Sequence, residues 1–306
     1  MHTWNHDLAG GAEKREDAGS PPFEVFPMVV APEKVRFCVL GSGSSGNAAL
    51  IQTPRASVLL DIGFTPDEIG ARLEGTGADW DGLSAVVLTH THGDHLKKRT
   101  LKEILRRGIP FHCHEAHARH LRGGRYFKRL AEAGLVRTYA AERPFEVAGE
   151  LLFHPLRLPH DCPPTFGFRI ETADGAGRAR RLGYLVDLGH WTAELLAACA
   201  DVDLLALEFN HDEALERGSG RHPRLIARVL GREGHLSNVQ AAGALERLLG
   251  GGPHGAPARV VQMHLSEDCN RPELAFEAAC EVVRRLGAKT QVFSTRQDAR
   301  GTVHEM

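Results

Sequence analysis

The sequence predicts an α/β fold in which strands and helices form layers within one domain. Short apolar segments bounded by turn residues alternate with amphipathic segments along most of the chain, an order typical of layered α/β domains. Hydrophobic residues make up 42% of the chain, which is enough for a substantial core. A run of metal-binding residue types, residues 90–95, directly follows one apolar segment and places a candidate site at a strand end.

Strands are expected wherever a short apolar run lies between turn-forming residues. In chain order these runs cover residues 35–40, 48–53, 57–60, 85–89, 110–112, 136–139, 151–156, 166–170, 181–186, 204–207 and 259–263. The glycine- and serine-rich segment 41–46 separates the first two runs. We interpret it as a tight turn, because it lacks the Lys-Ser/Thr pair of a phosphate-binding P-loop.

Helices are expected where apolar residues recur at spacings of three and four. In chain order these segments cover residues 66–74, 97–107, 193–199, 223–230, 238–249 and 272–286. Ser237 or Asn238 is suited to cap the fifth of them, since short polar side chains accept hydrogen bonds from the first free amides of a helix.

Two regions of different character divide the chain. Residues 1–33 are polar, contain Gly and Pro and show no periodicity, so we expect a poorly ordered tail. Met28 lies shortly before the first expected strand, so residues 1–27 are either part of that tail or not translated. Residues 34–306 show no linker-like break and no fixed repeat, which favours a single domain.

Bulk composition excludes several classes of protein. The formal net charge is −2, so no global basic field indicates nucleic-acid binding. The six cysteines contain no C-x-x-C pair and suit reduced thiols in a cytoplasmic protein. We find neither a signal peptide nor an apolar run of the roughly 18–20 residues that a membrane helix needs. The oligomeric state remains open.

The strongest functional signal is the run His90-Thr91-His92-Gly93-Asp94-His95. Imidazole and carboxylate groups are ligands that zinc, manganese and iron accept. Gly93 is expected to let the loop turn these side chains towards one point. The alternative, a polar loop with exposed histidines, is disfavoured because the run directly follows a buried strand.

Further ligands must come from distant loops, because one short motif supplies only one side of a metal cage. His160, Asp187 and His264 each follow a strand-like segment, residues 151–158, 182–186 and 260–263. Taken singly, His160 or His264 could equally be a structural histidine. Repeated placement of ligand types at strand ends is how layered α/β folds build sites, and this favours a shared metal centre.

These residues carry a resemblance to the metallo-β-lactamase superfamily, and within it to the bacterial YycJ (WalJ) group of DNA exonucleases. The strings that carry it, besides the run above, are L-G-S-G-S-S-G-N at residues 40–47, E-F-N-H-D at 208–212, G-H-L-S-N at 234–238 and H-L-S-E at 264–267. The resemblance covers roughly residues 35–295. It implies an αββα fold with two mixed β-sheets sandwiched between helices.

The resemblance also implies how the ligands are shared between two divalent ions, Zn²⁺ or Mn²⁺ with Fe²⁺ as a further option. The first ion would be held by His90, His92 and His160, the second by Asp94, His95 and His264, with Asp187 bridging both. Asp61 would orient the histidine loop without binding metal itself.

A group of residues outside the ligand set is expected to serve the reaction. His235 resembles the histidine that contacts the scissile phosphate in the tRNA-processing RNase Z enzymes. We expect it to bind phosphate or protonate the leaving oxygen, with Glu208 and His211 orienting it and Asp94 completing the catalytic set. The alternative is a histidine that only closes a helix N-terminus.

The expected reaction is phosphodiester hydrolysis, and DNA degraded from the 5′ end follows from the resemblance alone. The basic segment 97–99 is either a nucleic-acid contact or an ordinary solvated surface. One alternative is a hydrolase of small molecules such as a cyclic nucleotide, a lactone or a thioester. An iron oxidoreductase is disfavoured because the diiron members carry H-x-E where this chain has His90-Thr91-His92. A pure binding module is the remaining alternative.

Overall fold

The computed structural model describes residues 34–162, 164–251 and 256–306, which belong to one compact unit. The tail predicted for residues 1–33 lies outside the described residues. Within them, no helix is both long and apolar enough to cross a membrane.

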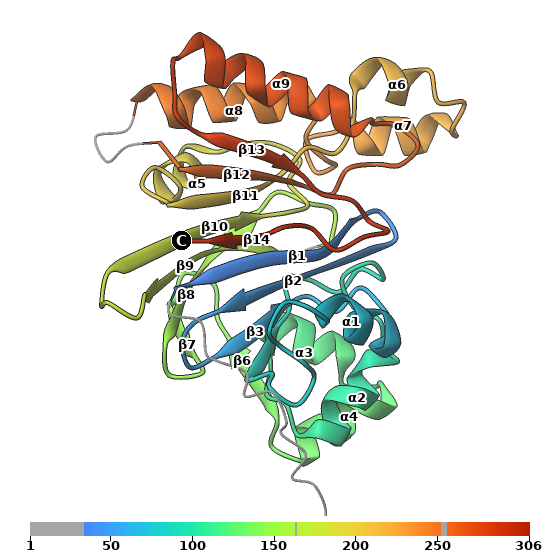
Figure 1. Ribbon diagram of the computed structural model, residues 1–306. Coiled ribbons are helices and arrows are strands. Elements are labelled where there is room, and N and C mark those ends of the chain that lie inside the picture. Colours follow the sequence, from blue (N-terminus) through green and yellow to red (C-terminus); the bar gives the residue numbers. More distant parts are fainter. Residues whose placement is uncertain (1–33, 163, 252–255) are drawn as a thin grey trace, which may run out of the picture. The chain divides into compact units, whose positions relative to one another are not determined.

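Two seven-stranded mixed β-sheets form the centre of this unit (Figure 1). The first sheet has the order β14-β1-β2-β3-β4-β5-β6, and its strands are β1 Arg36–Gly43, β2 Gly46–Gln52, β3 Ser57–Leu60, β4 Ala85–Val87, β5 Phe111–His114, β6 Val136–Tyr139 and β14 Val303–Glu305. The second has the order β13-β12-β11-β10-β9-β8-β7, and its strands are β7 Phe145–Val147, β8 Leu151–Leu158, β9 Thr165–Ala173, β10 Ala179–Leu185, β11 Leu204–Glu208, β12 Arg259–Met263 and β13 Gln291–Ser294.

Helices cover the outer face of each sheet. The helices beside the first sheet are α1 Pro66–Leu73, α2 Thr100–Arg107, α3 Glu115–Leu121 and α4 Arg125–Glu132. Those beside the second are α5 Ala193–Ala198, α8 Asn238–Gly251 and α9 Pro272–Arg285. The short helices α6 Glu213–Arg217 and α7 Pro223–Val229 follow β11 and lie beyond the ends of the strands (Figure 1).

The period-two pattern of the strands explains this layering. In β1, Phe37 and Val39 point into the core between the two sheets, whereas Cys38 and Leu40 point into the core beneath the helices. Strands that are buried on both faces must be apolar on both, and each large side chain removed from water contributes about 1.5–3 kcal/mol. The predicted αββα fold is therefore confirmed.

Strand direction determines where the site is built. β3 and β4 are parallel, as are β10, β11 and β12, so their carboxyl ends lie at one edge of each sheet. β8 runs antiparallel to β9, which runs antiparallel to β10, so β8 also ends at that edge. The loops after these strands carry the predicted ligands.

The structure departs from the sequence pattern in a few places. The expected helix 97–107 begins only at Thr100. The Lys97 N–H instead donates to the Ile62 carbonyl at 2.9 Å, and residues 98–99 form a turn that leads into the helix. The expected segments do not include α3, α4, α6, β7, β13 and β14. The turn expected over residues 41–46 is present but shorter, because β1 continues to Gly43 and β2 begins at Gly46, which leaves Ser44 and Ser45 as the turn.

Candidate metal centre

Side chains from five strand ends meet at the shared edge of the two sheets. They divide into groups whose ligand atoms all lie within 4.8 Å of one another. The first group is His90, His92 and His160, and the second is Asp94, His95, Asp187 and His264. Both sets coincide with the ligand sets that the resemblance implies, with Asp187 in the second group.

The first group consists of three imidazoles, and a backbone carbonyl positions one of them, His160. His160 Nε2 lies 3.4 Å from His92 Nδ1, and the opposite nitrogen of His160, Nδ1, lies 3.0 Å from the Gly234 carbonyl oxygen. Burial lowers the pKa of His90 and of His160. Both rings are therefore neutral near pH 7, which is the form that binds metal.

The second group combines imidazoles with carboxylates. Asp187 Oδ2 lies 2.7 Å from His95 Nε2, and His264 Nε2 lies 3.3 Å from Asp94 Oδ2. Burial by itself lowers the pKa of His264, but the carboxylates of Asp187, Asp94 and Glu208 together outweigh it, and the pKa rises to about 10. The carboxylates thus make this part of the site strongly attractive to positive charge.

Asp187 joins the two groups, because its Oδ2 also lies 3.3 Å from Nε2 of His90. The carboxyl group is only 1% exposed, yet neither of its oxygens makes a hydrogen bond of acceptable geometry among the described residues, even though His95 Nε2 lies 2.7 Å from Oδ2, and His90 Nε2 makes none either. An ionised carboxylate buried without donors is costly. These orphaned atoms face one another at the centre of the site, so the residues fit divalent cations.

Backbone strain accompanies three of the site residues. Asp61, Asp187 and His264 have φ values of 63°, 63° and 55°, in the left-handed region that side chains other than glycine rarely adopt. Each residue directly follows a strand: β3, β10 and β12, with Asp187 one residue further on. Strained backbone of this kind clusters at functional sites. Here it turns each side chain from the strand direction towards the centre.

The Asp61 carboxylate positions the histidine loop through its contacts with Thr89 and His95. Its Oδ2 lies 2.7 Å from His95 Nδ1, and its Oδ1 accepts the backbone N–H of Thr89 at 2.8 Å. The Thr89 hydroxyl also donates to this carboxylate and lies 3.0 Å from His90 Nδ1. Because its oxygens are occupied in this way, Asp61 is placed to orient His95 and leaves Nε2 of that ring facing Asp187.

Both oxygens of the Glu208 carboxylate also have hydrogen-bond partners, although Glu208 belongs to a further group of possible metal ligands with Asp187, His235 and His264. Its Oε1 lies 2.7 Å from His235 Nδ1 and 3.0 Å from His264 Nδ1. Its Oε2 accepts the backbone N–H groups of Leu188 and Leu236, at 2.9 and 3.2 Å. Burial raises the pKa of Glu208, but His235 and His264 outweigh this and lower it to about 2. Glu208 is thus an ionised carboxylate that holds two histidines.

The His211 side chain, which we predicted to orient His235 together with Glu208, makes no hydrogen bond to it. His211 is buried, but neither nitrogen of its ring has a hydrogen-bond partner among the described residues. Its backbone does the positioning, because the Asn238 N–H donates to the His211 carbonyl oxygen at 2.8 Å at the start of α8. The expectation that the His211 side chain orients His235 is corrected accordingly, and Glu208 alone makes that contact.

The glycine that shapes the histidine loop is Gly63. A Cβ on Gly63 would lie 1.8 Å from the Asp94 carbonyl oxygen, whereas a Cβ on Gly93 would meet nothing within 4 Å. The same Asp94 carbonyl accepts the Asn47 N–H at 2.7 Å, so the loop is fixed to β2 across the space that Gly63 leaves free. The sequence argument for Gly93 was therefore wrong.

Asn47 is a site residue that the sequence analysis did not assign. Its side-chain nitrogen lies 3.0 Å from His95 Nε2 and 3.3 Å from Asp94 Oδ2. Asn210 is comparable, since its Nδ2 donates to the His264 carbonyl oxygen at 2.8 Å. Both residues lie within strings that carry the resemblance, and that was the available signal.

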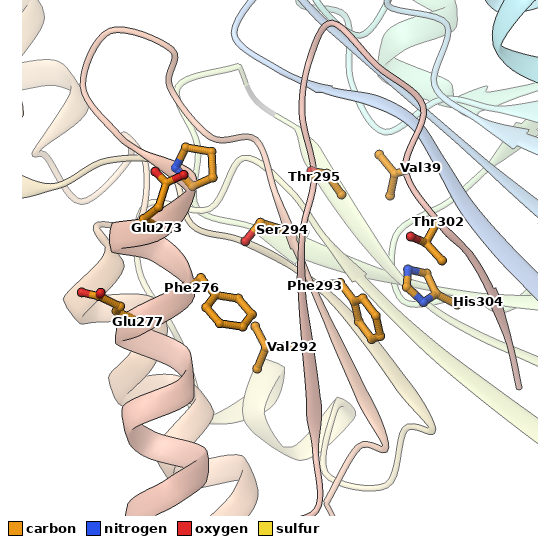
Figure 2. A pocket seen from close by; sticks show the side chains of 12 residues that line it. Val39, Glu273, Phe276, Glu277, Val292, Phe293, Ser294, Thr295, Thr302 and His304 are labelled. Carbon is orange, nitrogen blue, oxygen red and sulfur yellow. The ribbon is translucent and has the colours of Figure 1, made fainter.

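The two groups open into a cleft of about 640 Å³. Its lining includes Asp94, Asp187, His235 and His264 together with several residues of the segment after β11. A second cavity of about 480 Å³ lies between α9 and β13, with Phe276 and Val292 near one another and Phe293 close to His304 (Figure 2). The second cavity is lined by none of the clustered ligand residues, so the first is the candidate active site.

Comparison with known proteins agrees with this geometry. Residues 57–265 match the family model described as the beta-lactamase superfamily domain. The chain is 24% identical over 275 residues to the exodeoxyribonuclease WalJ of Streptococcus pneumoniae, covering 86% of this chain and 95% of that protein. It is 25% identical over 260 residues to the exodeoxyribonuclease YycJ of Bacillus anthracis, covering 83% and 90%.

The fold is shared with solved structures as well. The metallo-beta-lactamase fold protein YhfI from Bacillus subtilis superposes with a TM-score of 0.62, covering 89% of this chain and all of that chain at 17% identity. At this identity the likeness concerns the fold alone.

Proposed function

This chain belongs to the beta-lactamase superfamily and is a metal-dependent hydrolase, and from that premise we propose that it is a binuclear phosphodiesterase, a DNA exonuclease that degrades its substrate from the 5′ end. The observation that carries the proposal is the position of Asp187, whose Oδ2 lies within 3.3 Å of His90 from the first group and 2.7 Å of His95 from the second. Such an arrangement suits two cations that share one carboxylate.

The protein would hold the ions through residues from both sheets. His90, His92 and His160 would bind one, Asp94, His95 and His264 the other, and Asp187 both. Zn²⁺ or Mn²⁺ fits this set of nitrogen and oxygen donors, and so does Fe²⁺. Two such ions supply a hydroxide nucleophile near pH 7 and neutralise charge on the attacked phosphorus.

His235 supports phosphodiester hydrolysis in particular. Its Nδ1 is engaged by the ionised Glu208 at 2.7 Å, which leaves Nε2 as the nitrogen available to a substrate in the cleft. We assign to Nε2 the binding of the scissile phosphate and the delivery of a proton to the leaving oxygen. Glu208 stabilises the positive charge that this histidine carries before it gives up the proton.

DNA is favoured as substrate by the relatives. The two named above are exodeoxyribonucleases, and the chain matches them over 95% and 90% of their lengths. The match therefore spans nearly the whole of each relative. Degradation from the 5′ end is part of the proposal and requires direct measurement.

The proposal is tested by assaying the metal-stripped protein on end-labelled duplex DNA and RNA, with zinc or manganese added back. We expect metal to restore DNA degradation, the labelled end to report polarity, and Asp94→Ala to abolish the activity. Asp67→Ala, which removes an exposed carboxylate of α1, serves as the matched control and should behave as wild type. Binding of two ions without cleavage of either nucleic acid would refute the nuclease and favour hydrolysis of a small molecule.

A further inference from the structure

Helix α7 and the loop before it bring two arginines to the wall of the active-site cleft. Arg221, Leu225 and Arg228 line the cleft together with the candidate ligands Asp94 and Asp187. Leu225 and Arg228 are three residues apart and therefore lie on one side of α7, whereas Arg221 precedes the helix, in the loop that leads into it. The cationic groups of this segment therefore face the same space as the metal centre.

Arg228 is anchored beside the first ligand group. Its Nε donates to Asp161 Oδ2, and the other oxygen of Asp161 lies 3.3 Å from His160 Nε2. The Arg228 side chain remains 51% exposed. A guanidinium group has five N–H donors in a planar fork, and Asp161 occupies only part of it. The remaining donors are free to bind an anion in the cleft.

Arg221 is held by two carboxylates, those of Glu216 and Asp268. Its two terminal nitrogens donate to Glu216 Oε2 at 3.1 Å and to Asp268 Oδ2 at 2.8 Å. Glu216 is fully buried, whereas Asp268 is 79% exposed in its side chain. The buried partner fixes the position of the guanidinium group, and the exposed partner is one that a stronger anion can displace.

Between the two arginines lies Leu225, whose surface is 38% exposed. An exposed leucine flanked by cations suits a ligand that carries phosphates on either side of an apolar face. Nucleotides in a chain have this chemistry, because charged phosphates alternate with flat bases. A neutral ester or lactone offers nothing to the two guanidinium groups.

We propose that Arg221 and Arg228 bind a phosphate group of the substrate other than the one that is cleaved. The cleft then selects a phosphodiester chain with at least two phosphates over an isolated phosphodiester. This inference rests on the proposed function, since it concerns the substrate of the same site.

Arg228 is the better of the two for a test. Removing Arg221 would leave the buried Glu216 carboxylate unpaired, and its Oε1 already lacks a hydrogen-bond partner among the described residues. The Arg228–Asp161 pair is half exposed, and pairs of that kind contribute little to stability. Arg224 on the same helix is exposed and does not line the cleft, so it provides a matched control.

The experiment measures binding and cleavage separately. Binding of a fluorescent 5′-phosphorylated thymidine trinucleotide is measured on the Asp94→Ala background, with and without Arg228→Gln or Arg224→Gln. Loss of a charge-assisted contact predicts that Arg228→Gln weakens binding about tenfold or more. It should also make the dependence of log Kd on log salt shallower by about one unit. Arg224→Gln should change neither quantity, and Arg228→Lys should recover part of the loss because it keeps the charge.

Cleavage is compared on the trinucleotide and on bis(p-nitrophenyl) phosphate, which carries one phosphate. Arg228→Gln should reduce kcat/KM on the trinucleotide by about tenfold more than on the single phosphodiester, chiefly through KM. Equal losses on both substrates, or equal trinucleotide binding by the Arg228 and Arg224 variants, would overturn the inference. If wild-type protein cleaves neither substrate but the difference in binding persists, the proposed function fails while the phosphate site stands.

Discussion

Oε1 of Glu208 lies 2.7 Å from Nδ1 of His235 and so determines which nitrogen of that histidine can meet a substrate. The same oxygen lies 3.0 Å from Nδ1 of His264, a candidate metal ligand. One carboxylate therefore orients a group assigned to proton transfer and a group assigned to metal binding. Variants of Glu208 and of His235 should therefore differ in their effect on metal binding.

His235→Ala should retain both metal ions and lose about 10²- to 10⁴-fold in kcat, the range of a general acid. The metal content of the purified variant and its turnover of DNA provide the check. Glu208→Gln should lose metal affinity as well as turnover, because His264 loses its orienting acceptor. Wild-type turnover in His235→Ala would show that this histidine only closes the start of α8.

Asp61→Asn should weaken metal binding by about 10- to 100-fold, as is typical when the partner of a ligating histidine is removed. The amide cannot accept from both the Thr89 N–H and His95 Nδ1 as strongly as the carboxylate does. Competition with a chromogenic chelator measures the affinity. Asp67→Asn, at an exposed position of α1, should leave it unchanged. An unaltered affinity in Asp61→Asn would exclude the orienting role.

Gly63→Ala should destabilise the protein by about 1–3 kcal/mol or more and displace the histidine loop, because overpacking forces the backbone to move. The added methyl group would lie 1.8 Å from the Asp94 carbonyl oxygen. Gly243→Ala is the control, since its Cβ would meet nothing within 4 Å in α8, and it should stabilise by up to about 1 kcal/mol. Denaturant unfolding of both variants distinguishes the two effects.

His117 should make the protein less stable as the pH falls below neutrality. Burial lowers the pKa of His117 to about 4, whereas the unfolded chain keeps the usual value of about 6.5. Between these values only the unfolded state takes up the proton, so stability is present above the upper value and is lost as the pH falls through the window. The free energy of unfolding decreases by up to about 1.4 kcal/mol for each pH unit within this window.

His117→Phe should remove that share of the pH dependence, and His120→Phe, at an exposed position, should not. The comparison uses the free energy of unfolding of each variant at pH 7.5 and pH 5. The same slope in both variants would show that His117 titrates normally in the folded protein.

The fold and the clustering of the candidate ligands could be predicted because their signals are local. Apolar strands and helices follow from short periodic patterns, and four candidate ligands are contiguous in residues 90–95. The separate candidate ligands His160, Asp187 and His264 could be proposed because each lies within two residues of the end of a strand. The edge strand β14 could not be predicted, since it is stabilised by pairing with β1 from the other end of the described chain.

The remaining features depend on packing between distant segments. Nothing in the sequence around α7 distinguishes Arg228, which lines the cleft, from Arg224, which does not. Likewise, Gly93 was more conspicuous than Gly63, although only Gly63 lies against the Asp94 carbonyl. The His211 side chain was assigned a contact from its position beside Glu208, but the turn into α8 uses its backbone instead.

The candidate ligands extend from His90, after a strand of the first sheet, to His264, after β12 of the second. During synthesis a nascent chain therefore cannot assemble the complete centre until β12 has left the ribosome and paired with β11. A chain interrupted before that point would lack His264, however well its first sheet had folded. Under the proposed function, copies of this protein that end before His264 would be harmless to DNA.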